Sequence, residues 1–428
     1  MSIVTIREIL DGLYEDKLVS FKGWIYRKRA SKKTIFLIVR DASGVIQCTV
    51  KQNADSWHQA ENATIESSIS VEGIAKHDER APGNYEISVE KLSIIGLAET
   101  FPITSGEESE QFLRDVRHLW IRSRKMNLIM KVRSEVLKFC HDFFREAGFY
   151  EVSPPMFISS ACEGGATLFG LKYFGNDLYL TQSAQLYLEA LIYSLEKVYC
   201  VAPSFRAEKS RTIRHLSEYW HVEPEWAFAK MDDLMKLEED LVSYICKKTV
   251  DNCQRELTSL KVDTSKLTAV NPPLPRITYT EAVEMLEAKD SKIKWGEDFG
   301  FEDEKILADN FEGPVFVYAY PTKIKAFYCK TYKDNPDLAM SVDMLVPRIG
   351  ELSTGGARED SKAELLKRLK HFGLSVKDYD WYIDLRRYGT VPHVGFGLGV
   401  ERLLTWMLEL ENIVDSIPFP RTIRRFYP

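Results

Sequence analysis

The sequence predicts an α+β protein with two domains: a small closed β-barrel, followed by a larger domain whose antiparallel sheet is flanked by helices. Three observations predict this. Five short strand-like runs fall within residues 17–97, helical and strand-like segments alternate from residue 121, and a polar segment separates the two patterns. The 428 residues are enough for two or three domains. We expect domains at 1–97 and 121–428, joined by a hinge at 98–120.

The N-terminal strands are expected at residues 17–23, 34–41, 45–51, 68–74 and 85–95, and this number in so short a segment indicates an oligonucleotide-binding (OB) barrel. Residues 17–40 hold eight Lys or Arg and no Asp or Glu, with Trp24, Tyr26 and Phe36 among them. One interpretation is a surface for single-stranded nucleic acid, where phosphates meet cations and bases stack on rings. The other is that Trp24 and Phe36 fill the barrel while the lysines solvate an edge strand.

The larger domain is expected to begin with an amphipathic helix at 126–147, ended by Gly148. Pro154 and Pro155 restrict the next strand to a sheet edge or an interface. Further helices are predicted at 184–195, 231–256, 363–372 and 399–411, a capping box at 278–281 opens another, and strands are predicted at 313–330 and 339–345. This order of elements favours α+β over a doubly wound sheet.

Composition and motif content exclude several classes of protein. A formal charge of −6 does not fit a globally basic nucleic-acid-binding protein, although a local basic patch is enough for binding. The seven cysteines form no CxxC pair, which favours a reduced, cytoplasmic protein. Without a signal peptide or a run of eighteen apolar residues, no membrane partner is expected. Neither GxxxxGK[ST] nor GxGxxG after a strand occurs, so a nucleotide would bind in another way.

A stretch at 204–228, SFRAEKSRTIRHLSEYWHVEPEWAF, places many charges beside residues typical of a sheet core. It is predicted to form a hairpin with a long charged loop. Alternate residues of a strand share a face, so Arg206 would lie with Glu208. The return strand would likewise present Tyr219, His221, Glu223 and Glu225 together. Buried charges are costly unless paired, so this face is either a structural ion-pair network or a site for a polyphosphate and a base.

A second stretch, VGFGLGVERLLTW at 394–406, has three alternating glycines directly before a predicted helix. Such glycines would let a flat ligand lie against the backbone, with Arg402 reaching over it. Alternatively, they permit tight packing of the helix on the sheet. The combination of this stretch with Arg-x-Glu before a charged loop is more specific than either motif alone.

These motifs resemble those of class II aminoacyl-tRNA synthetases of the aspartyl/asparaginyl/lysyl subgroup. Residues 148–157 are similar to motif 1 of that family, 205–225 to motif 2 and 395–402 to motif 3. The resemblance extends from GWIYRKR in the barrel to IPFPRT near the end, and EGGATLF and TQSAQLYLEA most resemble the archaeal and eukaryotic asparaginyl enzymes. It implies ATP-dependent ligation of asparagine to tRNA(Asn) through an asparaginyl-adenylate, in a homodimer that meets at the strand around Pro155.

The resemblance implies an ATP site in which Arg206 holds the α-phosphate, and Tyr219 and Arg402 stack on the two faces of adenine. The residues implied in ATP binding are Arg206, Glu208, Arg214, His215, Tyr219, Glu351, Gly397, Gly399 and Arg402, with Arg206 and Arg402 as the catalytic residues. Mg²⁺ would be held by Asp343, Glu351 and Thr354. The reaction needs alignment and charge neutralisation, and no protein nucleophile.

The residues implied in amino-acid binding are Glu163, Ser183, Gln185, Leu188, Glu223 and Arg358, the first three at the α-ammonium group. Leu188 stands where aspartyl enzymes have a lysine for the substrate carboxylate, and Glu223 where they have aspartate. Together these favour asparagine, whose amide could donate to Glu223 and accept from Arg358. Taken singly, Leu188 fits a helix-packing leucine better than a specificity residue. The run ELSTGGAR at 351–358 departs from the usual asparaginyl pattern, which leaves the fine shape of the pocket open.

In the barrel, the resemblance implies that Phe36 stacks on an anticodon base and Gln47 hydrogen-bonds to it. Arg27 and Arg29 would contact phosphates or bases, and Trp24 is then expected in the core.

Three other functions fit parts of the sequence. An aspartyl-tRNA synthetase, including one that also charges tRNA(Asn), would share the motifs. An asparagine synthetase would let ammonia attack an aspartyl-adenylate, but such relatives resemble the catalytic region without the barrel. A non-catalytic RNA-binding protein would not need Arg206, Glu208, Glu351 and Arg402, which are all present.

Overall fold

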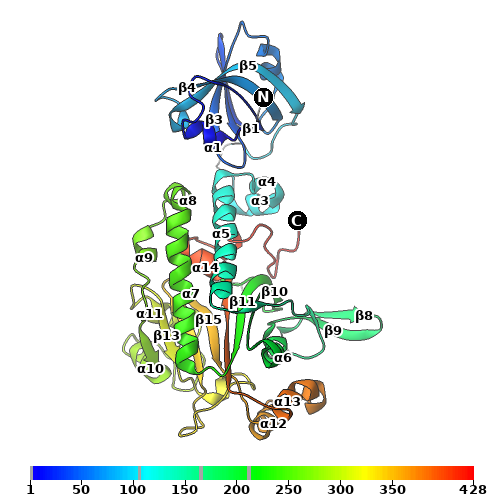
Figure 1. Cartoon of the computed structure of the whole chain (residues 1–428), viewed down its shortest axis with the longest axis vertical. Helices are drawn as coiled ribbons and strands as arrows, with labels where there is room; N and C mark the ends of the chain where they lie inside the picture. Colours follow the sequence, from blue (N-terminus) through cyan, green and yellow to red (C-terminus); the bar gives the residue numbers. More distant parts are fainter. Residues whose placement is uncertain (1–2, 105–107, 163–166, 210–213) are drawn as a thin grey trace. The chain divides into compact units, whose positions relative to one another are not determined.

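The structure, a computed structural model, describes residues 3–104, 108–162, 167–209 and 214–428. The chain separates into two compact units, Met1–Arg114 and Asp115–Pro428, both traced in Figure 1. The boundary between them falls within the segment 98–120 that the sequence predicts as a hinge.

The first unit is a closed five-stranded barrel, as predicted. Its strands are β1 (Leu18–Ala30), β2 (Thr34–Arg40), β3 (Val45–Lys51), β4 (Ser68–His77) and β5 (Tyr85–Gly96), joined in the order β1-β2-β3-β5-β4. Buried and partly exposed residues alternate along β2 and β3, so one face of each strand fills the barrel. The helices α1 (Ile6–Leu10) and α2 (Trp57–Asn62) also contribute to this core, and η1 (Pro82–Asn84) precedes β5.

The prediction that Trp24 lies in the barrel core is wrong. Its neighbours Gly23 and Ile25 on β1 are buried, so the alternation of the strand turns Trp24 outward. Its side chain is 43% exposed, and the guanidinium of Arg40 lies over its ring at 5.2 Å from the centroid.

The second unit is built on an eight-stranded sheet in the order β12-β13-β14-β15-β16-β11-β10-β6. In that order the strands are Arg276–Thr278, Val315–Tyr318, Ser341–Val346, Gly350–Ala357, His393–Gly399, Glu218–Ala227, Lys197–Phe205 and Tyr150–Glu151. Adjacent strands are antiparallel except for the outermost pairs, β12 with β13 and β6 with β10. The predicted hairpin is present, since β10 and β11 pair from Lys197↔Trp226 to Phe205↔Glu218.

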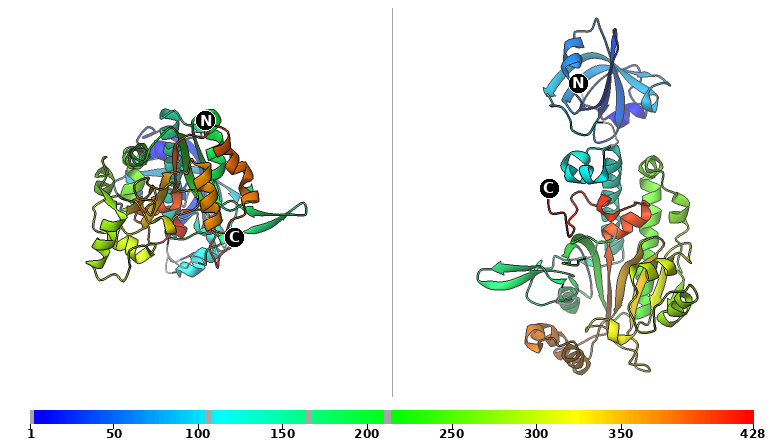
Figure 2. Two further views of the ribbon diagram at one scale, coloured as in Figure 1. Left: turned by 90° about the horizontal axis from the view of Figure 1, so that it is seen from below. Right: turned by 180° about the vertical axis from the view of Figure 1, so that it is seen from behind.

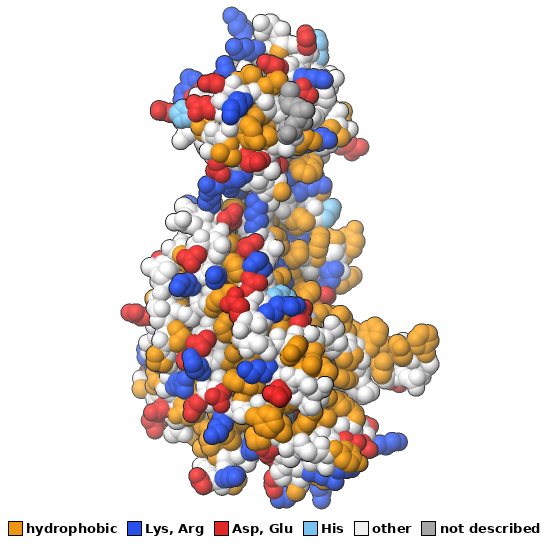
Figure 3. All heavy atoms as spheres, viewed as in Figure 1, with side chains coloured by type: hydrophobic (Ala, Val, Ile, Leu, Met, Phe, Trp, Pro, Cys, Tyr) orange, Lys and Arg blue, Asp and Glu red, His pale blue; other side chains and the backbone are white. Residues whose placement is uncertain are grey.

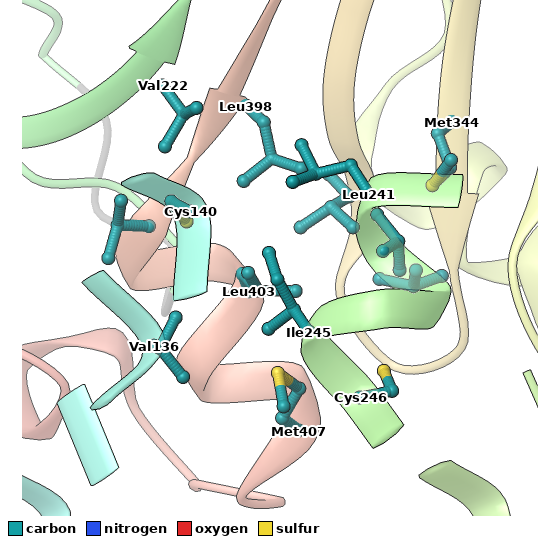
Figure 4. Close-up of a cluster of buried hydrophobic side chains, with 14 of the residues drawn as sticks. Val136, Cys140, Val222, Leu241, Ile245, Cys246, Met344, Leu398, Leu403 and Met407 are labelled. Carbon is teal, nitrogen blue, oxygen red and sulfur yellow. The ribbon is translucent and has the colours of Figure 1, made fainter. Parts of the chain in front are cut away.

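Three helices, α5 (Arg124–Glu146), α7 (Met231–Asn252) and α14 (Val400–Met407), pack against one face of this sheet. Figure 4 shows their side chains meeting those of the strands, for example Ile245 and Leu403 beside Leu398. Val222 of β11 belongs to the same core. Its odd-numbered neighbours therefore point to the opposite face, which leaves that face free to build a site.

Further helices, 3-10 turns and a small sheet complete the elements of the described residues. The helices are α3 (Glu110–Asp115), α4 (Arg117–Trp120), α6 (Gln185–Leu195), α8 (Gln254–Leu260), α9 (Thr264–Thr268), α10 (Tyr279–Glu287), α11 (Phe301–Ala308), α12 (Lys362–His371) and α13 (Asp380–Arg387), with 3-10 turns η3 (Thr322–Ile324), η4 (Val376–Tyr379) and η5 (Ile413–Asp415). A small sheet joins β7 (Phe157–Ile158), β9 (Asn176–Leu180) and β8 (Gly170–Tyr173). Figure 2 shows the β8–β9 hairpin extending away from the main sheet.

Three predicted elements have other bounds. The strand predicted at 313–330 ends at Tyr318, because Ala319 has a left-handed φ of +60° and Pro321 lacks an N–H donor for pairing. The helix predicted at 231–256 ends at Asn252, and α8 begins after Cys253. The last helix ends at Met407 rather than at residue 411.

Candidate active site

The odd-numbered face of β11 opens into a cavity of about 300 Å³. Most of the residues singled out in the sequence line this cavity: Ser183, Gln185, Arg206, Glu208, Arg214, His215, Tyr219, Glu223, Glu351, Thr354, Arg358, Gly397, Gly399 and Arg402. Three do not. Leu188 is fully buried in a separate apolar cluster with Ile192 and Val198, Asp343 is not among the lining residues, and Glu163 lies outside the described part of the chain.

The alternating glycines of β16 make room for the charged face of β11. Glu225 is the register partner of Gly395, and a Cβ atom on Gly395 would overlap the Glu225 carboxylate. A Cβ on Gly397 would come within 3.0 Å of the His221 ring, whereas one on Gly399 would meet nothing closer than 3.8 Å. The lack of a Cβ atom at Gly395 and Gly397 therefore makes room for protein side chains, in addition to the room for a ligand that the sequence suggested.

One part of the cavity, which contains Arg206, Arg214, His215, Glu351 and Arg402, is termed the ATP half. There, Arg402 donates to the carboxylate of Glu351 at 2.6 Å and to the backbone carbonyl oxygen of Glu351 at 2.9 Å. Burial opposes ionisation of Glu351, but Arg402 and Arg214 outweigh it and lower its pKa to about 2. Arg206 lies 3.9 Å from Glu208 and its guanidinium lies 5.7 Å from the centroid of the Tyr219 ring. These cations and this ring suit a polyphosphate and a base.

Arg214, also in the ATP half, is held by a residue that the sequence did not single out. Both of its terminal nitrogens donate to the Glu304 carboxylate of α11, one of them at 3.1 Å, and its guanidinium stacks 4.8 Å from the Phe301 centroid. The same carboxylate accepts the backbone N–H of Glu351 at 2.7 Å. Glu304 therefore joins Arg214 to the strand that carries Glu351.

His215 lies beside these cations. Burial, then Arg402 and Arg214, lower its pKa to about 4, because all three disfavour a second positive charge. Its Nε2 atom is 3.5 Å from the Glu208 carboxylate. At neutral pH the His215 ring is therefore uncharged.

The residues implied in Mg²⁺ binding are engaged with cations of the chain. Asp343 accepts from Lys325 Nζ at 2.7 Å, and Glu351 accepts from Arg402. Burial raises the pKa of Asp343, while Lys325 acts against that shift. Among the described residues, no group of three or more His, Cys, Asp or Glu is arranged to hold a metal ion. Two carboxylates fit a Mg²⁺ ion that takes its other ligands from phosphates and water.

In the other part, which we term the amino-acid half, Glu223 accepts hydrogen bonds from Ser183 Oγ and from the backbone N–H of Ala184 at 2.9 Å. Burial raises the pKa of Glu223, and these donors oppose the shift. Nδ1 of His221 lies 3.5 Å from the same carboxylate. Glu223 is thus fixed at the edge of the cavity by groups that leave part of its acceptor capacity unused.

Arg358 pairs with Glu225, a residue for which the sequence suggested no firm role. Its Nε and Nη2 atoms donate to Glu225 Oε1 at 3.1 and 2.5 Å, and its guanidinium lies 5.4 Å from the Tyr328 centroid. Side chains of both are almost completely buried. The alternation along β11 placed Glu225 on the correct face, but no local signal shows a partner 133 residues away.

The four residues singled out on the barrel occupy adjacent strands of one outward face. Arg27 pairs in register with Ile38, which pairs with Gln47, while Arg29 pairs with Phe36 in the neighbouring row. Gln47 Nε2 donates to the Glu86 carboxylate at 3.0 Å, and Phe36 is half-buried. The arrangement combines cations, a ring and an amide within reach of an extended polymer.

No helix in the described parts of the chain is both long and apolar enough to cross a membrane.

Comparisons with known proteins agree with this geometry. A family model described as tRNA synthetases class II (D, K and N) matches residues 109–423, and one described as OB-fold nucleic acid binding domain matches residues 19–95. The chain is 46% identical over 417 residues to "Asparagine--tRNA ligase" of Thermococcus gammatolerans, and the aligned region covers 97% of each chain. A similar protein with the same description from Thermoplasma acidophilum is 43% identical over 430 residues, 100% of both chains.

Two solved structures are similar over nearly the whole chain. Asparaginyl-tRNA synthetase from Pyrococcus horikoshii complexed with asparaginyl-adenylate has a TM-score of 0.97 and 45% identity, covering 100% of both chains. The Entamoeba histolytica asparaginyl-tRNA synthetase, also with asparaginyl-adenylate, has a TM-score of 0.89 and 34% identity, covering 97% of both.

Proposed function

Because the chain belongs to the class II tRNA synthetases of the D, K and N group, we propose that it ligates asparagine to tRNA(Asn) in two steps. The observation that supports this most is a single cavity lined both by cations suited to phosphates and by a buried acceptor, Glu223. The relatives at this level of similarity are asparagine–tRNA ligases over almost their full length.

In the first step, a carboxylate oxygen of asparagine attacks the α-phosphorus of ATP. The bond from that phosphorus to the bridging oxygen breaks, and pyrophosphate leaves, giving asparaginyl-adenylate. Arg206 neutralises charge that develops on the α-phosphoryl oxygens, Arg402 lies over adenine, and Arg214 and His215 face the departing phosphates. Donors fixed before the reaction are the largest contribution that a site of this kind makes to rate.

In the second step, a hydroxyl oxygen at the 3′ end of the tRNA attacks the carbonyl carbon of the adenylate. AMP leaves with the electron pair of the broken carbon–oxygen bond, and the hydroxyl proton is released. No side chain becomes covalently attached in either step, which explains why the cavity needs no nucleophilic Ser or Cys.

Selection of asparagine over aspartate follows from Glu223 and Arg358. The asparagine amide NH₂ donates to Glu223, and its oxygen accepts from Nη1 of Arg358, the terminal nitrogen that Glu225 does not take. The carboxylate of aspartate would lie against Glu223 without a donor between them, which is unfavourable in a buried site. Leu188 does not line the cavity, and its side chain is enclosed by apolar neighbours.

ATP would enter with Mg²⁺, which supplies positive charge between the phosphates. We propose that Glu351 and Thr354, which line the cavity, and Asp343, the register partner of Thr354, would hold that ion. Arg402 favours the ionised form of Glu351, and Lys325 opposes the effect of burial on Asp343.

The barrel would bind the anticodon through Phe36, Gln47, Arg27 and Arg29. Stacking of a base on a ring contributes about 1–3 kcal/mol, so Phe36→Ala should weaken tRNA binding. The rate of ATP–pyrophosphate exchange measured without tRNA should be unchanged.

A homodimer through the strand around Pro155 is supported by apolar residues that stand exposed there. Tyr150 is 60% exposed, Met156 48% and Phe157 52%. Figure 3 shows further hydrophobic side chains gathered on the nearby β8–β9 hairpin, where Phe174 is 91% exposed. Exposed apolar patches of this kind mark protein interfaces. A cytoplasmic location is supported by the cysteines, which are all buried and form no CxxC pair in the sequence.

The function is tested by aminoacylation of tRNA together with ATP–pyrophosphate exchange. We expect asparagine to support exchange without tRNA and to become esterified to tRNA(Asn), and we expect added ammonia to change neither result. Exchange with aspartate alone would contradict the proposal. Release of free asparagine from aspartate and ammonia would indicate the asparagine synthetase reaction instead.

A further inference from the structure

Behind the amino-acid half lies a fully buried ion network that the mechanism above does not use. Its centre is Glu189 of α6, whose carboxylate accepts hydrogen bonds from four side chains. The donors are Gln185 Nε2 at 3.0 Å, Tyr382 Oη at 2.7 Å, Arg386 Nη2 at 2.6 Å and His393 Nε2 at 2.9 Å. The network joins α6 to α13 and to β16.

The Glu189 side chain is held as a carboxylate. Burial alone would favour the neutral acid, but Arg386 and His393 outweigh it and keep the pKa of Glu189 below its ordinary value. The other nitrogen of His393, Nδ1, lies 2.8 Å from the carbonyl oxygen of Val391, so both ring nitrogens face acceptors. An ionised carboxylate can only accept hydrogen bonds.

This restriction fixes the side chain of Gln185, which lines the cavity one helical turn before Glu189. Because Glu189 only accepts, Gln185 must turn its amide NH₂ group toward it. The amide oxygen is then the end available to the cavity. The opposite orientation would press two acceptors together in a buried site, which is costly. The backbone N–H of Gln185 also donates to Ser183 Oγ at 3.2 Å, which anchors the residue.

We propose that Glu189 is a positioning residue that holds the Gln185 amide with its oxygen toward the α-ammonium group of the amino acid. This inference rests on the proposed function, in which Gln185 helps to receive that ammonium. An ammonium group only donates, so it is attracted by the amide oxygen and repelled by the amide NH₂. A Gln185 side chain free to rotate would lose affinity for the amino acid, while ATP binding would be unaffected.

The test is ATP–pyrophosphate exchange by Glu189→Gln, with succinamate as a competing ligand. Succinamate is asparagine without its α-amino group, so it cannot report on an ammonium contact. We expect the KM for asparagine to rise about tenfold or more, while the KM for ATP and the inhibition constant of succinamate change less than about twofold. A merely structural role for Glu189 would weaken asparagine and succinamate equally.

The double variant Gln185→Glu with Glu189→Gln exchanges the amide and the carboxylate. The new amide at 189 can donate to the carboxylate at 185 and accept from Arg386 and His393, while that carboxylate faces the ammonium. We expect the KM for asparagine to return to within about threefold of the parent value. Damage to the buried core would not be repaired by a second change inside it.

A matched control is Glu238→Gln, another buried glutamate of the second unit. Glu238 accepts from Ser353, and burial raises its pKa to about 8, so its carboxyl group is largely neutral near pH 7. Replacement by an amide should leave both KM values unchanged, and it therefore reports what a buried Glu→Gln change does by itself.

An unchanged asparagine KM in Glu189→Gln would overturn the inference, as would equal weakening of asparagine and succinamate. If that variant does not fold, the double variant is compared with Gln185→Leu, which lacks the acceptor. A folded double variant that binds asparagine as poorly as Gln185→Leu also overturns it. Failure of the proposed function is distinct, because the parent chain would then support exchange with aspartate, whose ammonium tests the same contact.

Discussion

The ATP half and the amino-acid half of the cavity hold their charges differently. In the ATP half, the side chains of Arg402 and Glu351 are 18% and 32% exposed. In the amino-acid half, those of Arg358 and Glu225 are 5% and 1% exposed. Arg214 is the exception in the ATP half, since its pair with Glu304 is buried.

This difference in the exposure of the ion pairs suits the two tasks of the cavity. A partly exposed ion pair costs little to open because water screens it, so its cation can turn to an incoming phosphate. A buried pair is costly to open, so it keeps one geometry. The triphosphate must enter and pyrophosphate must leave, whereas an amide must be distinguished from a carboxylate. We infer an adaptable ATP half and a preorganised amino-acid half.

The largest effect is expected from Glu225→Ala, which leaves Arg358 buried without its partner. We expect the free energy of unfolding to fall by about 3–5 kcal/mol, as measured by urea denaturation. The matched variant in the ATP half, Glu351→Ala, should lower it by less than Glu225→Ala does, because its pair with Arg402 is partly exposed, while abolishing exchange. Equal destabilisation by the two variants would remove the contrast between the halves.

Arg206→Ala should separate catalysis from stability. Loss of one fixed donor at the α-phosphate is expected to lower the rate of pyrophosphate exchange about 10²–10³-fold. Because the Arg206 side chain is 30% exposed, the midpoint of urea unfolding should stay near that of the parent chain. A stable variant that keeps its exchange rate would show that Arg206 does not act on the transition state.

Gly395→Ala and Gly399→Ala compare the two halves of the cavity at two positions of the same strand, β16. The new methyl group at 395 would collide with Glu225, whose position Arg358 fixes, so we expect a loss of about 1–3 kcal/mol in unfolding free energy. At 399 the nearest atoms belong to the flexible Arg402 side chain, and the loss should be smaller. Thermal unfolding of both variants measures the two losses of stability. A larger loss for Gly399→Ala than for Gly395→Ala would contradict the packing described for β16.

The smallest effect is expected from the titration of His215. Burial and the neighbouring arginines lower its pKa to about 4 in the free chain, and bound phosphates of opposite charge should raise it. Binding then favours the protonated ring, so ATP binding should take up a proton and strengthen as pH falls from 7 toward 5. Calorimetry in buffers of different ionisation enthalpy measures this uptake. If His215→Gln shows the same uptake as the parent, the proton goes elsewhere.

Local patterns were enough to predict the barrel and the faces of the site. Short strand-like runs separated by turns predicted the barrel, and alternation along β11 placed His221 and Glu223 together. The resemblance, and not the alternation, misplaced Trp24, because the inward positions of β1 belong to Gly23 and Ile25. The strand predicted at 313–330 ends early because Ala319 takes a left-handed φ and Pro321 lacks an N–H donor, and only the proline is visible in the sequence.

The partners of the charged groups could not be predicted in this way. Arg214 and Glu304 are 90 residues apart, Arg358 and Glu225 133, and Glu189 and His393 204. No spacing along the chain encodes such pairs, because only the folded sheet and its helices bring them together. The sequence therefore indicated which residue types the site uses, and the structure indicates which of them remain available to a ligand.

We infer above all that the amino-acid half is preorganised to accept an amide and reject a carboxylate. The measurement that tests it most directly is the ratio of kcat/KM for asparagine to that for aspartate in ATP–pyrophosphate exchange without tRNA. We predict a ratio of about 10⁴, as expected where a buried acceptor must be matched by a donor. A ratio near one, or a preference for aspartate, would contradict the account.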